Sequence, residues 1–379
     1  MRREAPLGVF VSGIALLGML LLPFAAPLIS ARSEERDARE AAEQAARERS
    51  GAVADGVPVK GAGHGHELPL SAPHWYATVH GDAGALAQVF AIDGSGKVLG
   101  PVLGPLPAKE PPLSELRGMA LLGNGDLAVM SAKMDSTRVL VFGAPDAASG
   151  IRPFRMTWAA KGDANPAMVH AYQIAVGPDG ALYTSNQDTN TVTRFQGLGT
   201  GAPGRPLPVP PGLAAFGTMM PGTVVPNSQQ SPEGLELVRG FAFGPDGMLW
   251  VCDRGRSRIA VHDPGSGRFV RAALTAADGL EHPIQAMFTD DGRRLLVTDN
   301  KANCVWELPV QGGRVRELVK RGDGGLQAPS AVALRDGVLY VGSRLGQQVL
   351  KYDAKHGRFL GVFCDLPGNP EFLVPVSQQ

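Results

Sequence analysis

Three side chains of this sequence could carry out proton transfer, namely His170, His282 and Glu371. An imidazole and a carboxylate can serve as general base and general acid. Arg117 and Arg239 could hold an anion through bidentate hydrogen bonds, or stabilise negative charge that develops during a reaction. Together these residue types would suit a hydrolase or lyase acting on a small ester or lactone, provided that the fold brings them together.

A repeated phrase predicts the elements that would position these residues. It reads QIAVGPDGALYTSN at Gln173–Asn186 and GFAFGPDGMLWVCD at Gly240–Asp253, and three further copies follow the same pattern. Each copy is an apolar run, a glycine-centred turn and a second apolar run, which is typical of a β-hairpin. The turn glycines are Gly125, Gly180, Gly247, Gly292 and Gly337, at steps of 55, 67, 45 and 45 residues. A unit of about 45 residues indicates four short strands, the size of a propeller blade.

Five copies do not close a ring, and the two ends of the chain supply a sixth unit. Trp75–Val79, Gln88–Asp93 and Lys97–Leu99 look like the last three strands of a blade, and Asn369–Val374 looks like its missing inner strand. A C-terminal strand that completes the first blade would leave no open edge there. The sequence therefore predicts an all-β, six-bladed β-propeller over about residues 70–376, in a domain of residues 70–379. An open β-solenoid is the alternative.

Counting back from each turn glycine predicts which side chains face the central channel. The starts of the inner strands of a propeller gather at one mouth of this channel, which we call the channel mouth. Eight residues before the turn glycine (seven in the last copy), and at the matching place in the closing strand, lie Arg117, Tyr172, Arg239, Ile284, Ser330 and Glu371. Two positions earlier lie Glu115, His170, Leu237, His282, Ala328 and Asn369.

We expect five polar residues of this region to contact a ligand, namely Arg117, Tyr172, Arg239, Gln285 and Asn369. The alternative is that these side chains bond only to one another and to water. A second polar set follows the second strands and comprises Asn186, Asp253, Asp299 and Asn300. Asp and Asn at such places commonly accept hydrogen bonds from the backbone of the following turn, and ligand contact is the alternative.

A family likeness is carried by Gly177–Tyr183 (GPDGALY) and Gly244–Trp250 (GPDGMLW), with Arg258, Ile259 and Val261 later in the same unit. These repeats resemble those of NHL-repeat propellers and of the related gluconolactonase–regucalcin-like and virginiamycin B lyase-like proteins. The resemblance covers about residues 70–376 and implies a six-bladed fold. If this chain is similar to the gluconolactonase-like relatives in function too, the resemblance implies a divalent metal, which those relatives hold with a Glu, an Asn and an Asp at inner-strand starts.

The ring of this chain departs from that metal-binding pattern. Glu371 matches the Glu, whereas none of the five equivalent positions holds Asn or Asp. A hard cation needs several oxygen ligands, and the two arginines of the ring would repel it. We therefore expect neither a metal nor another cofactor, and a divalent metal is the disfavoured alternative.

Composition limits the class of partner and the state of the cysteines. The chain has 36 basic and 36 acidic residues, so it lacks an overall field that would attract nucleic acid, and we expect no nucleic-acid partner. Cys252, Cys304 and Cys364 lie in strand-like runs without a CxxC motif. This spacing favours buried free thiols, with a Cys252–Cys304 pair as the alternative.

The N-terminal region predicts export. Basic residues precede an apolar stretch, Leu7–Ile29, so residues 1–31 are expected to form a signal peptide or an uncleaved membrane anchor. Residues 32–69 are expected to form a charged helical spacer and a Gly-rich linker. His64 and His66 of this linker, with His74 and His80, could bind a metal, and solvated chain is the alternative. Either way the propeller is predicted to lie outside the cytoplasm, in the periplasm or at the cell surface, and to meet the membrane through its N-terminal helix.

Two functions are compatible with these patterns. The favoured one is an extracytoplasmic binding or scaffold module that meets a small anionic ligand or a protein partner. Its contact surface would be the channel mouth or the Pro-rich insertion Gly197–Leu237. The alternative is a hydrolase or lyase acting on a small lactone or ester, which requires His282, Glu371 and an arginine to converge in an open pocket.

Overall fold

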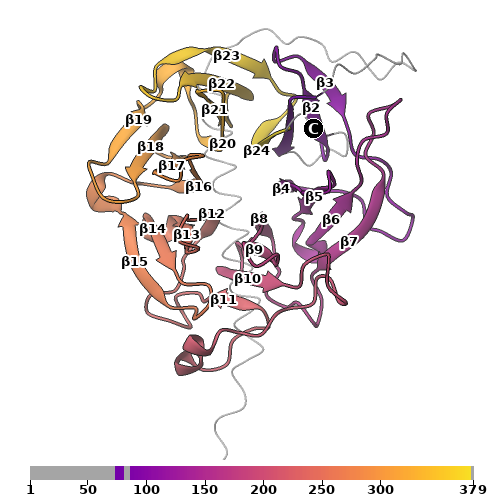
Figure 1. Ribbon diagram of the computed structural model, residues 1–379, viewed down its shortest axis with the longest axis vertical. Coiled ribbons are helices and arrows are strands. Elements are labelled where there is room, and N and C mark those ends of the chain that lie inside the picture. The colour runs from indigo at the N-terminus through magenta and orange to yellow at the C-terminus, as the bar shows by residue number, and fades with distance from the viewer. Residues whose placement is uncertain (1–72, 81–85, 377–379) are drawn as a thin grey trace, which may run out of the picture. The chain divides into compact units, whose positions relative to one another are not determined.

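The computed structural model describes residues 73–80 and 86–376 (Figure 1). The segment predicted to be a signal peptide or anchor over residues 1–31 and the spacer and linker predicted over residues 32–69 lie outside these described residues. Within the described part of the chain, no helix is both long and apolar enough to span a membrane.

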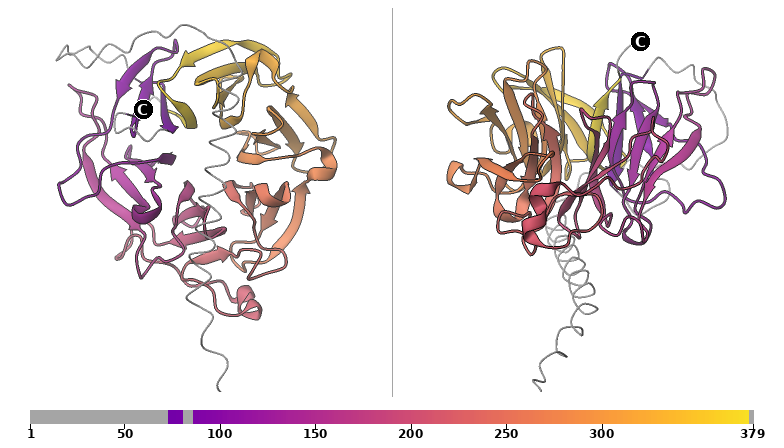
Figure 2. Two further views of the ribbon diagram at one scale, coloured as in Figure 1. Left: turned by 180° about the vertical axis from the view of Figure 1, so that it is seen from behind. Right: turned by 60° about the horizontal axis from the view of Figure 1, so that its bottom comes forward.

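Six antiparallel sheets of four strands are arranged as blades around a central channel (Figures 1 and 2). The first blade contains β24 (Asn369–Pro375), β1 (Trp75–His80), β2 (Val89–Ile92) and β3 (Val98–Pro101). The second contains β4 (Leu116–Leu121), β5 (Leu127–Ser131), β6 (Arg138–Phe142) and β7 (Phe154–Ala160). The third contains β8 (Ala171–Val176), β9 (Leu182–Asn186), β10 (Thr191–Phe195) and β11 (Thr223–Val225).

The remaining three blades follow the same inner-to-outer order. The fourth contains β12 (Val238–Phe243), β13 (Leu249–Asp253), β14 (Arg258–His262) and β15 (Phe269–Leu274). The fifth contains β16 (Pro283–Phe288), β17 (Arg294–Asp299), β18 (Cys304–Pro309) and β19 (Arg316–Val319). The sixth contains β20 (Pro329–Arg335), β21 (Val338–Ser343), β22 (Gln348–Asp353) and β23 (Phe359–Asp365). Short 3₁₀ turns are η1 (Met134–Ser136), η2 (Pro211–Phe216), η3 (Arg254–Arg256), η4 (Ala276–Asp278) and η5 (Asp323–Gly325).

The predicted all-β, six-bladed propeller is confirmed, and the open solenoid is excluded. The first blade combines strands from opposite ends of the described chain. β24 pairs with the full length of β1, with Tyr76 opposite Val374 and Ala77 opposite Leu373. Because β2 pairs with its other edge, β1 has a hydrogen-bonded neighbour on both sides.

The repeated GPDG phrase forms the turn of the inner hairpin. Gly180 and Gly247 have φ angles of 73° and 77°, in the left-handed region that a side chain disfavours. The amide of Gly180 donates to the Gly177 carbonyl at 2.9 Å, and Gly247 bonds to Gly244 in the same way at 2.9 Å. The phrase is therefore explained by turn geometry.

The core lies between neighbouring blades rather than in a single centre. One cluster packs Trp250 and Cys252 of the fourth blade against Val297, Cys304 and Trp306 of the fifth. The three cysteines of the chain are buried free thiols, as predicted, and Cys252 and Cys304 are not paired. Burial of such side chains stabilises the ring blade by blade.

Glutamine side chains also join neighbouring inner strands. Gln173 of β8 donates its Nε2 to the Phe241 carbonyl at 2.6 Å, and its Oε1 accepts from the Phe241 amide at 3.0 Å. In the same way Oε1 of Gln285 accepts from the Val332 amide of the next blade at 2.9 Å. Gly240 makes this approach feasible, because a Cβ there would lie 2.6 Å from the Gln173 Oε1 atom.

Candidate binding site at the channel mouth

A β-bulge in each inner strand positions the side chains of the channel. In β12, Val238 pairs with Asp253 and the next pair is Phe241 with Val251, so Arg239 and Gly240 lie opposite a single residue. The inner strands of the other five blades contain the same one-residue excess. A bulge twists a strand and redirects a side chain. The residues at the bulges are Arg117, Tyr172, Arg239, Ile284, Ser330 and Glu371.

These six side chains fill the channel. Each of the six residues is between 1% and 8% exposed. Tyr172 and Ile284 belong to one apolar cluster with Phe372, and the rings of Tyr172 and Phe372 lie 5.3 Å apart. The bulge ring is thus a packed layer of mixed polar and apolar groups.

Glu371 is the centre of the polar part of this layer. Its Oε1 lies 3.1 Å from Nη1 of Arg117 and accepts from Nε of Arg344 at 2.9 Å. Its Oε2 accepts from the Tyr172 hydroxyl at 3.3 Å. Burial raises the pKa of Glu371, but the charges of Arg117 and Arg344 outweigh burial and lower this pKa to about 2. Glu371 is therefore a buried, permanently charged carboxylate at neutral pH.

His80, at the end of β1, extends the cluster. Nη1 of Arg117 lies 2.8 Å from Nδ1 of His80. The charge of Arg117, followed by burial, lowers the pKa of His80 to about 4. His80 is consequently neutral at pH 7, and its Nδ1 can accept the hydrogen bond from the guanidinium. The structure thus uses His80 as a partner of Arg117.

His170 is held between two carboxylates. Its Nε2 lies 3.3 Å from Oε2 of Glu115, and its Nδ1 lies 3.3 Å from Oδ1 of Asp188. Burial disfavours the charged imidazole, but the bonds to Asp188 and Glu115 outweigh it and raise the pKa of His170. The bond to His170 is also the largest cause that lowers the pKa of Glu115 to about 2. This trio is a second charged group at the same mouth.

The backbone at these inner-strand starts is unusual. Glu115, His170, Leu237 and Ala328 have φ angles of 48°, 49°, 50° and 47°, all in the left-handed region. Such angles are uncommon for residues other than glycine and cost of order 1 kcal/mol each. These left-handed angles recur at the same position of four blades, so the repeat sets the backbone at the strand start. The same backbone sets the direction of the Glu115 and His170 side chains.

Tyr172 lies between two arginines. The guanidinium carbons of Arg117 and Arg239 are each 5.9 Å from the centre of its ring. Burial raises the pKa of Tyr172, so the phenol stays protonated and can donate to Glu371. The structure therefore brings together four predicted site residues, namely Arg117, Tyr172, Arg239 and Glu371.

His282 belongs to the wall of a separate hollow. This hollow has a volume of about 400 Å³ and includes Ser257, Glu281, Lys301 and Arg321 in its lining. The Glu281 carboxylate is paired with Lys301 at 3.2 Å and with Arg321 at 2.9 Å. The structure thus assigns His282 to this polar hollow and Glu371 to the packed layer of the channel.

The other two predicted ligand contacts lie beside the channel cluster. Gln285 bonds to the backbone of the sixth blade through Val332, so its amide oxygen is engaged in joining blades. Asn369 is the first residue of β24 and pairs with His80 across the sheet. Both residues lie next to members of the cluster along the chain or across the sheet, and their uncharged side chains form no ion pair.

The aspartates that follow the second strands organise the backbone of the mouth. Buried Asp299 accepts from the amides of Glu281 at 2.7 Å, His282 at 2.9 Å and Ala302 at 3.1 Å, and from Nε1 of Trp306 at 3.2 Å. Only the Ala302 bond is the turn contact expected from sequence. The bonds from the Glu281 and His282 amides fix the residues that precede β16, the inner strand of the same blade.

Arg344 is the main member of the cluster that sequence reasoning missed. It follows β21 in the sixth blade and reaches Glu371 in the first. A serine precedes it where three other blades have an Asn or Asp, and this serine gives no sign of the partner of Arg344. In the described ranges 73–80 and 86–376, there is no group of three or more His, Cys, Asp or Glu side chains arranged to hold a metal ion.

Comparison with known proteins identifies the fold but no activity. No protein-family model matches the sequence, and no curated protein matches it. The chain is similar to a chain of the nidogen/laminin complex, at 14% identity and a TM-score of 0.55, over 81% of this chain and 99% of that chain. It is also similar to a protein of unknown function from Bacteroides caccae, at 15% identity and a TM-score of 0.51, over 81% and 99% of the two chains.

A more distant match is a catalytically inactive virginiamycin B lyase from Staphylococcus aureus with quinupristin. It is 12% identical, with a TM-score of 0.41 over 64% of this chain and 67% of that chain. At such identities the likeness concerns the fold alone. The fold is that of a six-bladed β-propeller.

Proposed function

We propose that this chain is a protein-binding propeller that is held outside the cytoplasm by its N-terminal segment and meets its partner at the channel mouth. The observation that carries the proposal is the internal pairing of the Glu371 cluster. Its contacts join four of the six blades, because Glu371 lies in the first, Arg117 in the second, Tyr172 in the third and Arg344 in the sixth. A ring that is locked in this way is a rigid, preorganised platform.

The charges that remain accessible lie around this locked centre. The side chains of Glu115 and Arg344 are 25% and 24% exposed, which leaves one acidic and one basic group at the rim of the mouth. Charged groups at the edge of an interface set orientation and partner choice more than total affinity. A protein surface with matching charges of both signs would fit such a rim. The nidogen/laminin match, a propeller in a protein complex, is consistent with this use of the fold.

A small anionic ligand is less well supported than a protein. Arg117, one of the two arginines expected to bind it, and the nearby Arg344 already contact Glu371. Because the pKa of Glu371 is about 2, the carboxylate stays charged and competes with any incoming anion. An anion would therefore have to displace a buried partner, and breaking a buried pair is strongly unfavourable.

Hydrolase or lyase activity on a small lactone or ester is the second candidate, and one observation favours it. Asp188 lies against one ring nitrogen of His170, which is the arrangement that orients a general base. The other nitrogen faces Glu115 rather than a nucleophile, so a substrate would have to take the place of that carboxylate. His170 replaces His282 as the histidine on which this candidate depends.

Site-specific photo-crosslinking in the native host tests the proposal. A photoreactive residue replaces Lys133, which is exposed in the loop after β5 on the mouth side, or Asp246, which is exposed in the opposite hairpin turn. We expect a defined protein crosslinked from position 133 only, and this protein is then purified and titrated against the chain. Arg344→Gln and Glu115→Gln should weaken the measured affinity, whereas Asp246→Asn should not.

Equal crosslinking from both faces, or an affinity that the rim substitutions leave unchanged, would reject the mouth as the binding surface. A parallel assay of lactone and ester turnover addresses the second candidate. Turnover that disappears in His170→Ala and persists in Asp246→Asn would favour an enzyme over a binding module.

A further inference from the structure

The exposed apolar side chains of this propeller are concentrated on one outer strand. Phe359, Leu360 and Val362 of β23 are 39%, 51% and 45% exposed. The other large apolar side chains exposed to this degree in the described chain lie singly on other elements, and they are Met156, Val176, Phe216 and Val270. Single exposed apolar residues are ordinary, whereas three within four positions indicate an interaction site.

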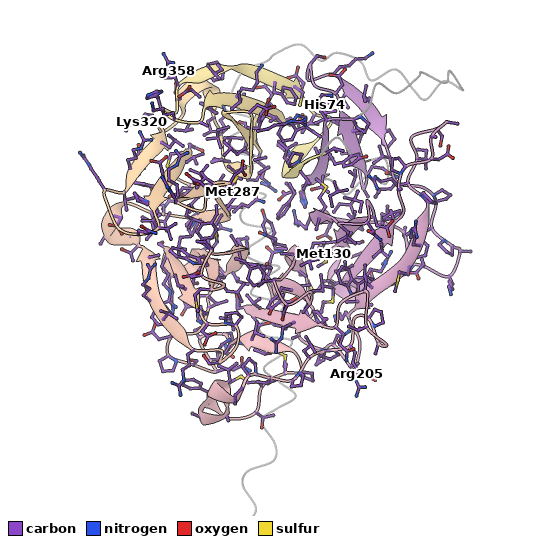
Figure 3. All side chains as sticks on the ribbon, in the orientation of Figure 1. His74, Met130, Arg205, Met287, Lys320 and Arg358 are labelled. Atoms are coloured by element: carbon purple, nitrogen blue, oxygen red, sulfur yellow. The ribbon has the colours of Figure 1, made fainter. Side chains whose placement is uncertain are left out.

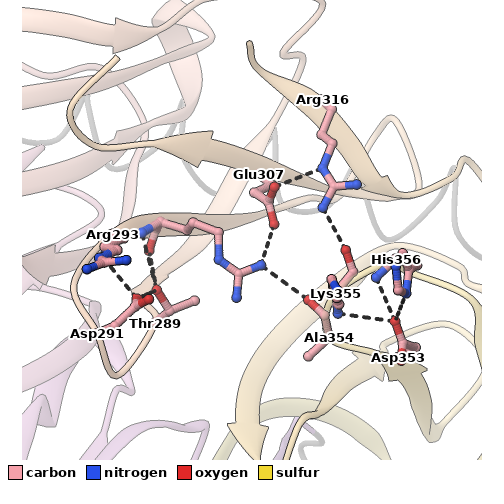
Figure 4. Close-up of polar contacts among 10 residues, drawn as sticks. Thr289, Asp291, Arg293, Glu307, Arg316, Asp353, Ala354, Lys355 and His356 are labelled. Carbon is pink, nitrogen blue, oxygen red and sulfur yellow. Dashed lines mark hydrogen bonds and ion pairs between the residues drawn. The ribbon is translucent and has the colours of Figure 1, made fainter. Parts of the chain in front are cut away.

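Basic side chains surround this apolar group. Arg358 immediately precedes Phe359, Lys355 lies in the same turn, and Arg314 precedes the adjacent outer strand β19; all three are exposed. Figure 3 shows Arg358 at the outer edge of the ring. The two blades meet here, because Nη2 of Arg316 donates to the Lys355 carbonyl at 2.8 Å (Figure 4). We call the six residues Arg314, Lys355, Arg358, Phe359, Leu360 and Val362 the basic apolar margin.

Two acidic side chains near this margin, Glu307 and Asp353, are engaged in local contacts. Glu307 is paired with Arg294 at 2.7 Å and with Arg316 at 2.8 Å (Figure 4). Asp353 accepts from the amides of Lys355 and His356, and these bonds help to lower its pKa. These two carboxylates are thus occupied by local partners, while Lys355 and Arg358 are exposed to solvent.

The chain enters the propeller beside the same blade. The carbonyl of His74, which precedes β1, accepts from Nη1 of Arg335 at the end of β20 at 3.0 Å. Trp75 packs on Tyr340 and Phe363 of the sixth blade, with ring centres 4.3 Å and 6.1 Å apart. Phe363 lies in β23 itself, so His74 and Trp75, at the start of the described chain, lie beside the strand that carries the margin.

We propose that the basic apolar margin rests on the surface of an anionic bilayer. The apolar side chains enter the interface between headgroups and acyl chains, as those of a surface-bound amphipathic element do. Arg314, Lys355 and Arg358 meet the lipid phosphates, which attract basic residues close to a membrane. The combination of clustered apolar groups, surrounding positive charge and an adjacent chain entrance distinguishes this margin from the other five outer strands.

The fourth blade provides a matched control for the test. Arg268, Phe269 and Val270 occupy the places in that blade that Arg358, Phe359 and Leu360 occupy in the sixth, at the start of the outer strand. Val270 is 52% exposed and Leu360 is 51% exposed, so labels at the two positions are equally accessible to solvent before any membrane is added. Because the native cysteines are buried, a cysteine introduced at either place is the reactive one.

The experiment uses the full chain reconstituted into vesicles. Leu360→Cys and Val270→Cys variants carry an environment-sensitive fluorophore, and quenching by a quencher attached to lipid is measured in phosphatidylcholine vesicles with and without phosphatidylglycerol. We expect strong quenching at position 360 only when phosphatidylglycerol is present, and weak quenching at position 270 throughout. Arg358→Gln should lower the docking constant about fivefold at low salt, whereas Arg268→Gln should leave it unchanged.

Two results would overturn the proposal. One is quenching at position 360 that does not exceed quenching at position 270 in anionic vesicles. The other is quenching at position 360 that does not depend on lipid charge or on Arg358, which would assign the apolar strand to a protein partner. Leu360 and Val270 are exposed, so unfolding of either variant is not expected, and circular dichroism checks this.

Discussion

Replacing Glu371 with glutamine tests whether the channel cluster holds the ring together through charge. The substitution keeps the shape of the side chain and its ability to accept hydrogen bonds, but it removes the negative charge. Arg117 and Arg344 then keep their positive charges next to a neutral group in the packed channel. Removing one partner of a buried ion pair typically costs about 3–5 kcal/mol.

The pKa of Glu371 leads to a similar magnitude. A fall from 4.5 to about 2 corresponds to roughly 3 kcal/mol of extra stability for the charged form. Because the folded-state pKa lies below the unfolded one, this stability is fully present above about pH 4.5 and is lost as the pH falls toward 2. The difference between the two proteins should therefore be about 3 kcal/mol at neutral pH and roughly half of that near pH 3.

Urea unfolding, followed by tryptophan fluorescence over this pH range, measures the difference. Trp75 lies in β1, which pairs with the strand that carries Glu371, so its emission reports on the first blade. The control is Glu317→Gln, since Glu317 pairs with Arg321, whose side chain is 48% exposed, and such surface pairs contribute less than about 1 kcal/mol. If Glu371→Gln costs no more than Glu317→Gln, or if its cost does not shrink in acid, the charge argument is wrong.

Three further predictions concern other buried groups. Asp299→Ala should cost about 3 kcal/mol or more, measured by urea unfolding, because it leaves three backbone amides and one indole without their buried acceptor. His262 is buried, and neither of its ring nitrogens has a hydrogen-bond partner in good geometry. Burial lowers the pKa of His262 to about 3, although the Gly267 backbone offsets part of this shift. Below about pH 6.5 the imidazole is therefore protonated in the unfolded chain but not in the folded chain, which destabilises the folded state as the pH falls. His262→Phe removes this effect and should reduce the acid-induced loss of stability by up to about 4 kcal/mol near pH 3. A thiol reagent should modify Cys252, Cys304 and Cys364 only on unfolding, because burial raises the pKa of each thiol.

The fold could be predicted from the sequence because few residue types can occupy its turns. A left-handed turn residue selects glycine, and Gly180 and Gly247 satisfy this requirement with φ angles of 73° and 77°. The strands on either side lie between two packed sheets and are therefore apolar along most of their length, as in residues 249–252, which are all buried. Turn and strand together repeat at the length of a blade, so the period is visible.

The partners within the channel could not be predicted in the same way. Counting from the glycines identifies which residue of each blade occupies the bulge, but it does not say which blades touch across the channel. Tyr172 and Glu371 are separated by 199 positions and meet through a hydrogen bond. Arg344 lies outside the inner strands altogether, and His80 is the last residue of a strand whose inner neighbour comes from the far end of the chain. Spacing along a sequence carries no information on such contacts.

The two proposed surfaces are compatible because they lie on different parts of the ring. The inner strands start at the channel mouth, and antiparallel pairing places their hairpin turns on the opposite side. Arg335 pairs with Val338 and Val338 pairs with Asp353, so the turn that contains Lys355 and Arg358 lies on the hairpin side of the sixth blade. A propeller that rests on a bilayer by this margin keeps its mouth turned away from the lipid. Rim substitutions at Arg344 should then change partner affinity without changing quenching at position 360, and Arg358→Gln should do the reverse.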